Sequence, residues 1–177
     1  MYTNPFSKRT TMTDIIRAGI LSDTHLTRPS QDFITAAQQC FANCEVIIHA
    51  GDLTDISVLD IFSDKTVYAV HGNCCGRTSH ASLPQEQRFQ LGNFTIGLLH
   101  GYTLGRYADT IEAGIWDVFP EADCVIYGHT HEPVCKRIAG KLLINPGAFQ
   151  VNNWYSGPCP HVILEAGQEL KGEICKY

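Results

Sequence analysis

Residues 15–25 read IIRAGILSDTH, an apolar run that ends in a carboxylate and an imidazole two positions apart. The aliphatic and β-branched residues of 15–21 predict a strand. If the backbone stays extended beyond this strand, Asp23 and His25 lie on one face and can chelate a single cation. Taken alone, an Asp-x-His triple is more typical of a solvated loop, so its meaning depends on the rest of the chain.

The same arrangement recurs twice further along the chain. Asp52 follows the aliphatic run of 45–49, and Asn73 follows that of 66–70. Both residues have an ordinary structural interpretation, because Asp favours the N-cap of a helix and Gly-Asn is common in turns. As a ligand, Asn73 would supply an amide oxygen, which is a hard donor without negative charge.

Helical spacing of apolar residues over 32–43 and 53–62 separates the three predicted strands. This alternation predicts a parallel sheet with right-handed crossovers. We expect one α/β domain over 14–177, with two sheets packed face to face and covered by helices, behind a flexible tail at 1–13. The other expected elements are a helix at 106–119 and strands at 88–91, 94–99, 124–127, 134–138, 142–144, 162–165 and 169–175.

Two further clusters carry histidines. His100 follows the run at 94–99, and Gly-His-Thr-His-Glu-Pro at 128–133 supplies His129 and His131. A lone histidine such as His100 is more often structural than a ligand, whereas two histidines at i, i+2 after a strand and a glycine converge on one point. All these residues would meet beyond the carboxyl ends of strands, where α/β sheets bind ligands. Oxygen and nitrogen donors without a thiolate pattern favour two divalent cations that share a carboxylate.

The composition of the chain argues against some classes of binding partner. The chain has 177 residues, 44% hydrophobic and 18% charged, and a net charge of -5, which argues against a surface that coats long nucleic acid. No run approaches the ~18 apolar residues of a membrane span, and no signal segment is recognisable. The 8 cysteines include no Cys-x-x-Cys, so we expect reduced thiols and a cytoplasmic protein. Two divalent cations that share a carboxylate point to an enzyme that moves phosphoryl groups, so a small phosphoester is the expected partner. Homo-oligomers are left open.

The ordered set of clusters, with its flanking glycines, resembles the calcineurin-like metallophosphoesterases over residues 17–149. It is most similar to the small bacterial and archaeal phosphodiesterases of that superfamily. The resemblance implies a four-layer α/β/β/α sandwich of two mixed sheets flanked by helices. It also implies a binuclear site, often filled by Mn²⁺, for which Fe²⁺, Zn²⁺, Ni²⁺ and Mg²⁺ are the alternatives.

The resemblance also assigns roles to residues. The implied ligands are Asp23, His25 and His131 for the first cation, Asn73, His100 and His129 for the second, and Asp52 as the bridge. The implied reaction is in-line attack of a metal-bridging hydroxide on phosphorus, with Asp52, Asn73 and His100 as catalytic residues. The expected substrate contacts are Cys74, Asn145 and Arg77.

One departure from the family pattern concerns the leaving group. Many larger relatives continue Gly-Asn with His, near the leaving group, whereas this chain has Cys74 and Cys75. Cys74 matches the small-phosphodiesterase variant, but Cys75 stands where Asp is expected. Loss of a general acid can cost ~10²-fold or more, so the sequence predicts a preference for good leaving groups such as aryl phosphodiesters.

Two other functions remain open. One eukaryotic branch of the superfamily uses this fold as a non-catalytic scaffold in a membrane-trafficking coat. Retention of all seven ligand types favours catalysis over a scaffold. A nuclease subunit is the third possibility, and the acidic net charge counts against it.

Overall fold

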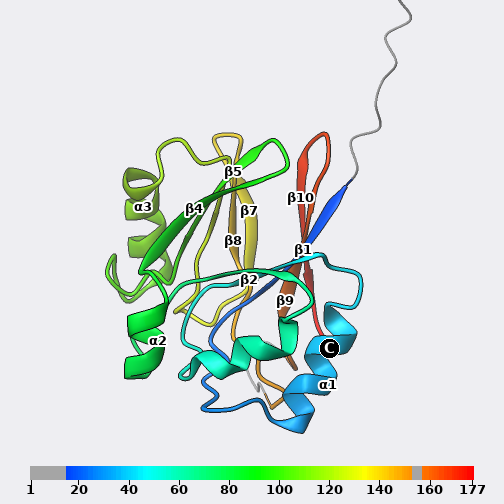
Figure 1. The fold of residues 1–177 in the computed structure, drawn as a ribbon. Coiled ribbons are helices and arrows are strands. Elements are labelled where there is room, and N and C mark those ends of the chain that lie inside the picture. Colours follow the sequence, from blue (N-terminus) through cyan, green and yellow to red (C-terminus); the bar gives the residue numbers. More distant parts are fainter. Residues whose placement is uncertain (1–14, 153–156) are drawn as a thin grey trace, which may run out of the picture.

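Two five-stranded sheets form the centre of the computed structural model, which describes residues 15–152 and 157–177 (Figure 1). The predicted flexible tail at 1–13 lies outside the described residues. No helix in the described part of the chain combines the length and apolarity needed to cross a bilayer.

The first sheet has the order β10-β9-β1-β2-β3. The parallel β1, β2 and β3 are joined by α1 (Gln31–Cys40) and by η1 (Ile56–Phe62), a 3-10 helix within the range 53–62 that was predicted to be helical. Ser30 caps α1 by accepting a hydrogen bond from Phe33 N at 3.2 Å. The strands of this sheet are β1 (Ile16–Leu21), β2 (Val46–His49), β3 (Thr66–Ala69), β9 (His161–Ala166) and β10 (Leu170–Cys175).

The second sheet has the order β4-β5-β6-β8-β7, with β5, β6 and β8 parallel. The helix α3 (Ala108–Val118) connects β5 to β6, and a short helix that was not expected, α2 (Arg77–Ser82), connects β3 to β4. The strands of this sheet are β4 (Glu86–Leu91), β5 (Phe94–Leu99), β6 (Cys124–Ile126), β7 (Val134–Ile138) and β8 (Lys141–Asn145).

Alternation along the strands produces the layers. On β1, Ala18 and Ile20 face the core between the sheets, whereas Leu21 packs in the cluster under α1 and η1. Gly19 is needed here, because a Cβ would lie 2.3 Å from the Phe41 ring. A third cluster lies under α3 and contains Ile111. The predicted four-layer sandwich of two mixed sheets is confirmed, and its parallel strands carry the polar clusters beyond their carboxyl ends.

Candidate metal centre

Backbone hydrogen bonds tie the loop after β1 to the loop after β2. Asp23 N donates to Gly51 O and His25 N donates to Asp52 O, both at 2.9 Å. Asp23, His25 and Asp52 have φ of 54°, 52° and 56°. The prediction that Asp23 and His25 lie in extended backbone is therefore wrong. The left-handed conformation costs about 1–2 kcal/mol per residue, and the two inter-loop bonds hold it in place.

The Gly-His-Thr-His loop after β6 is also left-handed, with φ of 71° at His129 and 61° at His131. At Gly128 a Cβ would lie 2.1 Å from Ser22 Oγ, so only glycine allows this loop to approach the loop after β1. The fully buried Asn145 supports the loop from below. Its Nδ2 donates to Gly128 O at 2.8 Å and to Thr130 Oγ1 at 3.0 Å, while its Oδ1 accepts from Gly147 N at 2.9 Å.

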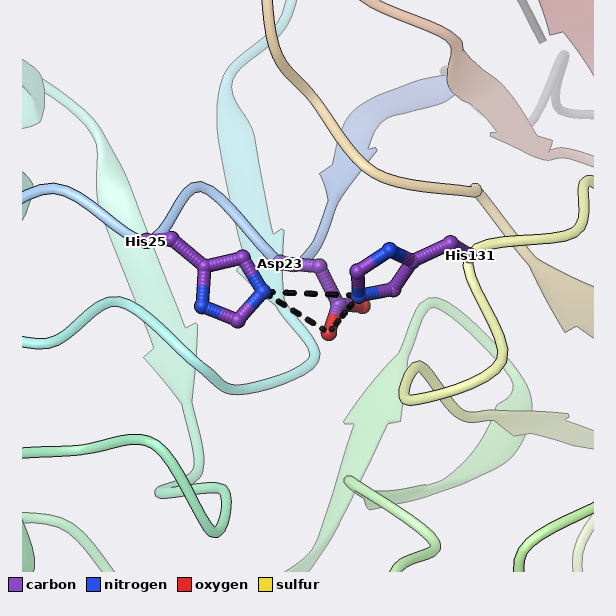
Figure 2. Close-up of side chains that lie close together, drawn as sticks. All are labelled: Asp23, His25 and His131. Atoms are coloured by element: carbon purple, nitrogen blue, oxygen red, sulfur yellow. Dashed lines mark hydrogen bonds and ion pairs between the residues drawn. The ribbon is translucent and has the colours of Figure 1, made fainter. Parts of the chain in front are cut away.

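The first group of donors consists of Asp23, His25 and His131 (Figure 2). Asp23 Oδ1 lies 3.2 Å from His131 Nε2 and 3.9 Å from His25 Nε2. The two Nε2 atoms are 3.4 Å apart. Three donor atoms at these separations can bind one cation together.

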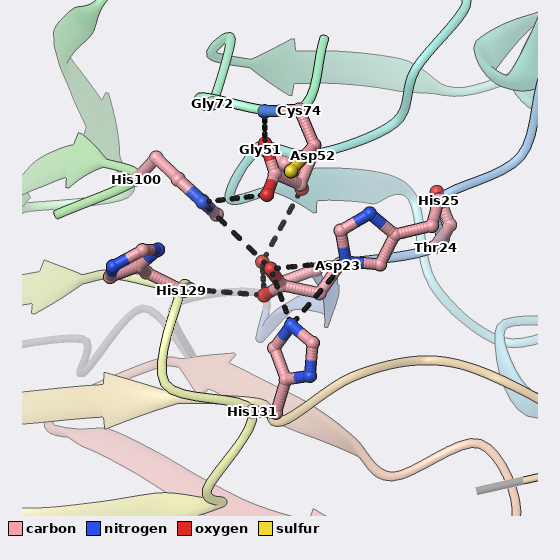
Figure 3. Close-up of polar contacts among 12 residues, drawn as sticks. Asp23, Thr24, His25, Gly51, Asp52, Gly72, Cys74, His100, His129 and His131 are labelled. Carbon is pink, nitrogen blue, oxygen red and sulfur yellow. Dashed lines mark hydrogen bonds and ion pairs between the residues drawn. The ribbon is translucent and has the colours of Figure 1, made fainter. Parts of the chain in front are cut away.

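The second group consists of Asp23, Asp52 and His100 (Figure 3). His100 Nε2 lies 3.2 Å from Asp52 Oδ2 and 3.8 Å from Asp23 Oδ1. His100 Nδ1 is 2.7 Å from Ala50 O, and a carbonyl can only accept. Nδ1 therefore carries a proton, which leaves the Nε2 of a neutral ring as the metal-ligating atom.

The remaining expected ligands are His129, which belongs to neither of these donor groups, and Asn73. His129 N donates to Asp23 Oδ2 at 3.1 Å, and its ring centroid is 5.3 Å from that of His100. Asn73 is exposed, and its Nδ2 donates to Cys74 Sγ at 3.2 Å, which leaves the amide oxygen available as a donor. The preceding Gly72 passes so close to the centre that a Cβ would lie 2.2 Å from Asp52 Oδ1.

Both carboxylates of the centre are ionised at neutral pH. Burial alone would raise the pKa of Asp52, but the His100 ring, whose Nε2 lies 3.2 Å from Asp52 Oδ2, and the hydrogen bond from Cys74 N lower it to about 2. Burial likewise opposes ionisation of Asp23, and His131, His100 and Ser22 together lower its pKa. The same carboxylates raise the pKa of His100 against the effect of its burial.

A cation fits the atoms that the protein leaves without partners. Three buried side-chain atoms of the described residues lack a hydrogen bond, namely Asp23 Oδ1, His100 Nε2 and His71 Nδ1. The first two face each other at 3.8 Å inside the centre. Buried polar atoms without partners are costly, and a bound divalent cation would satisfy both. Carboxylate, amide and imidazole donors accept manganese, iron, zinc and related cations.

The expected substrate contacts lie in three different environments. Cys74 is exposed, and its backbone N donates to Asp52 Oδ1 at 2.7 Å. Arg77 is exposed at the start of α2, whereas Asn145 is buried beneath the loop after β6. A contact of any of them with substrate stays a prediction.

Sequence reasoning missed one supporting residue. The buried Ser22 donates to Asp23 Oδ2 at 2.6 Å, and no signal except its adjacency to Asp23 marks it. His49 is fully buried, with Nδ1 accepting from Gly51 N at 3.2 Å and Nε2 lying 3.3 Å from Thr24 Oγ1. Burial lowers the pKa of His49 to about 4, so a neutral ring braces the two loops.

Two cavities flank the centre. One, of about 330 Å³, reaches from His25 to Phe33 and Gln150. The other, of about 540 Å³, is lined by His129, Glu132, Arg106 and Tyr107.

Comparison with known proteins identifies the family. Residues 16–167 match the model of the calcineurin-like phosphoesterase superfamily domain. A probable metallophosphoesterase of Methanothermobacter thermautotrophicus is 31% identical over 159 residues, which cover 89% of this chain and 91% of the relative. A phosphodiesterase of Methanocaldococcus jannaschii is 29% identical over 147 residues, which cover 75% of this chain and 83% of the relative.

The fold is also found in Vps29 of Entamoeba histolytica, whose structure was solved in complex with Zn²⁺. The TM-score is 0.64 at 22% identity, with 90% of this chain and 98% of that chain covered. The family match over most of the chain decides the classification, and this chain belongs to the calcineurin-like phosphoesterase superfamily.

Proposed function

We propose that this chain is a phosphodiesterase that uses two divalent cations, by preference Mn²⁺, to hydrolyse small or nucleotide-like phosphodiesters. The observation that carries the proposal is the pair Asp23 Oδ1 and His100 Nε2, which are buried, lack hydrogen-bond partners and face each other. The name of the phosphodiesterase relative supports the choice of a diester.

Seven side chains of this chain would hold the two cations in the proposed site. Asp23, His25 and His131 would hold one cation, and Asn73, His100 and His129 the other, with Asp52 between them. Bound there, two divalent cations lower the pKa of a water and neutralise charge on the phosphoryl oxygens. The inter-loop hydrogen bonds and the Ala50 carbonyl fix the ligand orientations, so little reorganisation accompanies the reaction.

Features of the larger flanking cavity favour a substrate with a flat aromatic group. Tyr107 is 66% exposed, and the Arg106 guanidinium lies 5.9 Å from the centre of its ring. Both residues line the same cavity as His129. An exposed aromatic face beside a cationic group fits a nucleoside or aryl substituent of a phosphodiester held at the centre.

A leaving-group series tests the expected lack of a general acid. The residue after Asn73 is Cys74, and burial together with the Asp52 carboxylate raises the pKa of its thiol. Rates for methyl, phenyl and 4-nitrophenyl esters of one phosphodiester should rise steeply as the leaving group improves. Equal rates for alkyl and aryl esters would show that another group protonates the leaving oxygen.

The direct test is a phosphoester panel. Protein stripped with a chelator is reloaded with Mn²⁺, Fe²⁺, Zn²⁺, Ni²⁺ or Mg²⁺ and assayed with bis(4-nitrophenyl) phosphate and with a monoester. We expect metal-dependent turnover of the diester above the monoester. Absence of turnover with every cation, although elemental analysis finds metal bound, would refute the phosphodiesterase proposal.

A protein-interaction scaffold is the second candidate, and the fold likeness to Vps29 favours it. Stoichiometric metal without hydrolysis in that panel would support this alternative. We also propose a cytoplasmic location. All eight thiols are free, which supports this location because disulfides persist in oxidising compartments.

A further inference from the structure

Cys74 lies against the metal centre. A ring nitrogen of His25, a carboxylate oxygen of Asp52 and Sγ of Cys74 all lie within 4.8 Å of one another. Figure 3 shows the Cys74 sulfur next to the Asp52 carboxylate, on the side from which His25 also approaches. The thiol is free and exposed, so no neighbouring side chain shields it from an incoming cation.

The local backbone fixes the position of this sulfur. Cys74 N donates to Asp52 Oδ1 at 2.7 Å, which anchors the residue to the carboxylate. Asn73 Nδ2 donates to Cys74 Sγ at 3.2 Å, a second contact that fixes the position of the sulfur. The close passage of Gly72 over Asp52 holds the whole loop against the centre.

Cys75, the adjacent thiol, has a different environment. Its Sγ accepts a hydrogen bond from Gly72 N at 3.2 Å, and its side chain packs against the cluster beneath α1 and η1. It belongs to none of the donor groups at the centre. Cys75 therefore packs against the core, whereas Cys74 faces the metal-binding side chains. Substitution of Cys75 is thus a matched control for substitution of Cys74.

A second observation also points to a cation beside Cys74. Asp23 Oδ1 and His100 Nε2 are buried, have side chains with 0% exposure and lack hydrogen-bond partners. Asp52, which Cys74 contacts, also belongs to the group with those two residues. The exposed Cys74 sulfur thus lies beside buried metal-binding atoms that have no hydrogen-bond partners.

We propose that Cys74 is a sulfur ligand of this metal centre, acting with His25 and Asp52 on one cation. Binding exchanges the S–H bond for a sulfur–metal bond and releases one proton to solvent. A thiolate ligand shifts selectivity from Mn²⁺ and Mg²⁺ toward thiophilic cations such as Zn²⁺, Co²⁺ and Cd²⁺. The inference rests on the metal centre of the proposed function but does not require that the chain hydrolyse a phosphodiester.

Co²⁺ titration of the stripped full-length protein tests the proposal without an activity assay. A sulfur ligand gives an intense sulfur-to-cobalt charge-transfer band in the near ultraviolet, which oxygen and nitrogen ligands lack. We expect this band in the wild type and in Cys75→Ser, and its loss in Cys74→Ser. A wild type without the band, or a Cys74→Ser protein that keeps it, would overturn the proposal.

Competition between Zn²⁺ and Mn²⁺ gives a second readout. Cys74→Ser should lower the preference for Zn²⁺ over Mn²⁺ about tenfold or more, whereas Cys75→Ser should leave it unchanged. Because serine keeps the backbone N–H to Asp52, a merely structural role for Cys74 predicts an unchanged ratio, which would contradict the proposal. Cys74→Ala, with circular dichroism to confirm folding, repeats the test without a hydroxyl.

Discussion

The charged side chains near the two ends of β1 differ in their burial. Beyond its carboxyl end, Asp23 is fully buried and lies 3.8 Å from the buried His100. Near its amino end, Arg17 forms an exposed pair with Glu165 at 2.7 Å, on the wall of a cavity of about 670 Å³. That cavity is larger than either one beside the metal centre. The contrast teaches that buried donors without hydrogen-bond partners mark the end of the molecule that carries the candidate metal centre, whereas cavity size does not mark it.

Among the variants considered, Asp52→Asn should have the largest effect on metal binding and activity. The change removes the charge that both cations would share, so we expect little retained metal and a loss of at least about a hundredfold in kcat/KM on bis(4-nitrophenyl) phosphate. Elemental analysis after dialysis and steady-state rates measure both effects. Glu165→Gln, on β9 opposite Arg17 of β1, is the control. Full activity in Asp52→Asn would remove the centre from the mechanism.

Asn145→Ala tests whether the support beneath the histidine loop matters. The variant loses the bonds to Gly128 O, Thr130 Oγ1 and Gly147 N, so the loop is less well held. We expect metal affinity to fall about 10–100-fold, as measured by calorimetric titration of stripped protein. Asn43→Ala, an exposed residue of the cavity near Arg17, should bind metal as the wild type does. Equal affinities in the two variants would mean that the loop needs no such support.

His161 sharpens the contrast among buried histidines. Carboxylates raise the pKa of His100, whereas His161 packs between Phe41 and Phe149, and burial lowers its pKa. As pH falls below about 6.5, His161 is therefore protonated in the unfolded chain before it is protonated in the folded protein. The free energy of unfolding then falls by at most about 1.4 kcal/mol per pH unit for this one proton.

Urea unfolding at a series of pH values compares the wild type with His161→Asn. The asparagine amide can still donate to Cys159 O, which lies 2.8 Å from His161 Nδ1 in the wild type, but it does not titrate. The free energy of unfolding of the variant should depend less on pH below 6.5. Parallel curves for the two proteins would contradict the pKa direction inferred for His161.

Arg17→Ala should have the smallest effect. The ion pair with Glu165 is exposed and screened by water and salt, so its loss should change neither the metal content nor the rate of hydrolysis. A clear fall in activity would show that the two ends of β1 are coupled and would weaken the contrast.

Most of the fold was predictable because its elements are local patterns. Runs such as Val46-Ile-Ile identify strands without any tertiary information. The type of η1 was not predictable from apolar spacing, which is similar for an α-helix and a 3-10 helix over so few residues. α2 was missed because RTSHAS contains no apolar periodicity.

The expected donors that the structure brings together could be predicted by residue type and order, but the way they are held could not. Left-handed backbone at Asp23 and His25 depends on partners after β2, which no spacing reveals. The role of Asn145 as a support arises from contacts with a loop that is distant in sequence. Such information belongs to the folded chain rather than to its motifs.

The bonds between the loops after β1 and β2 have a kinetic consequence. Asp23 and His25 hold their conformations through protein hydrogen bonds, and Asp52 is fixed from the opposite side by Cys74 N. Because hydrogen bonds within the protein hold these donors, metal uptake should require no slow closure of the loops. The rate of capture should be governed by how fast the hydrated ion sheds its water.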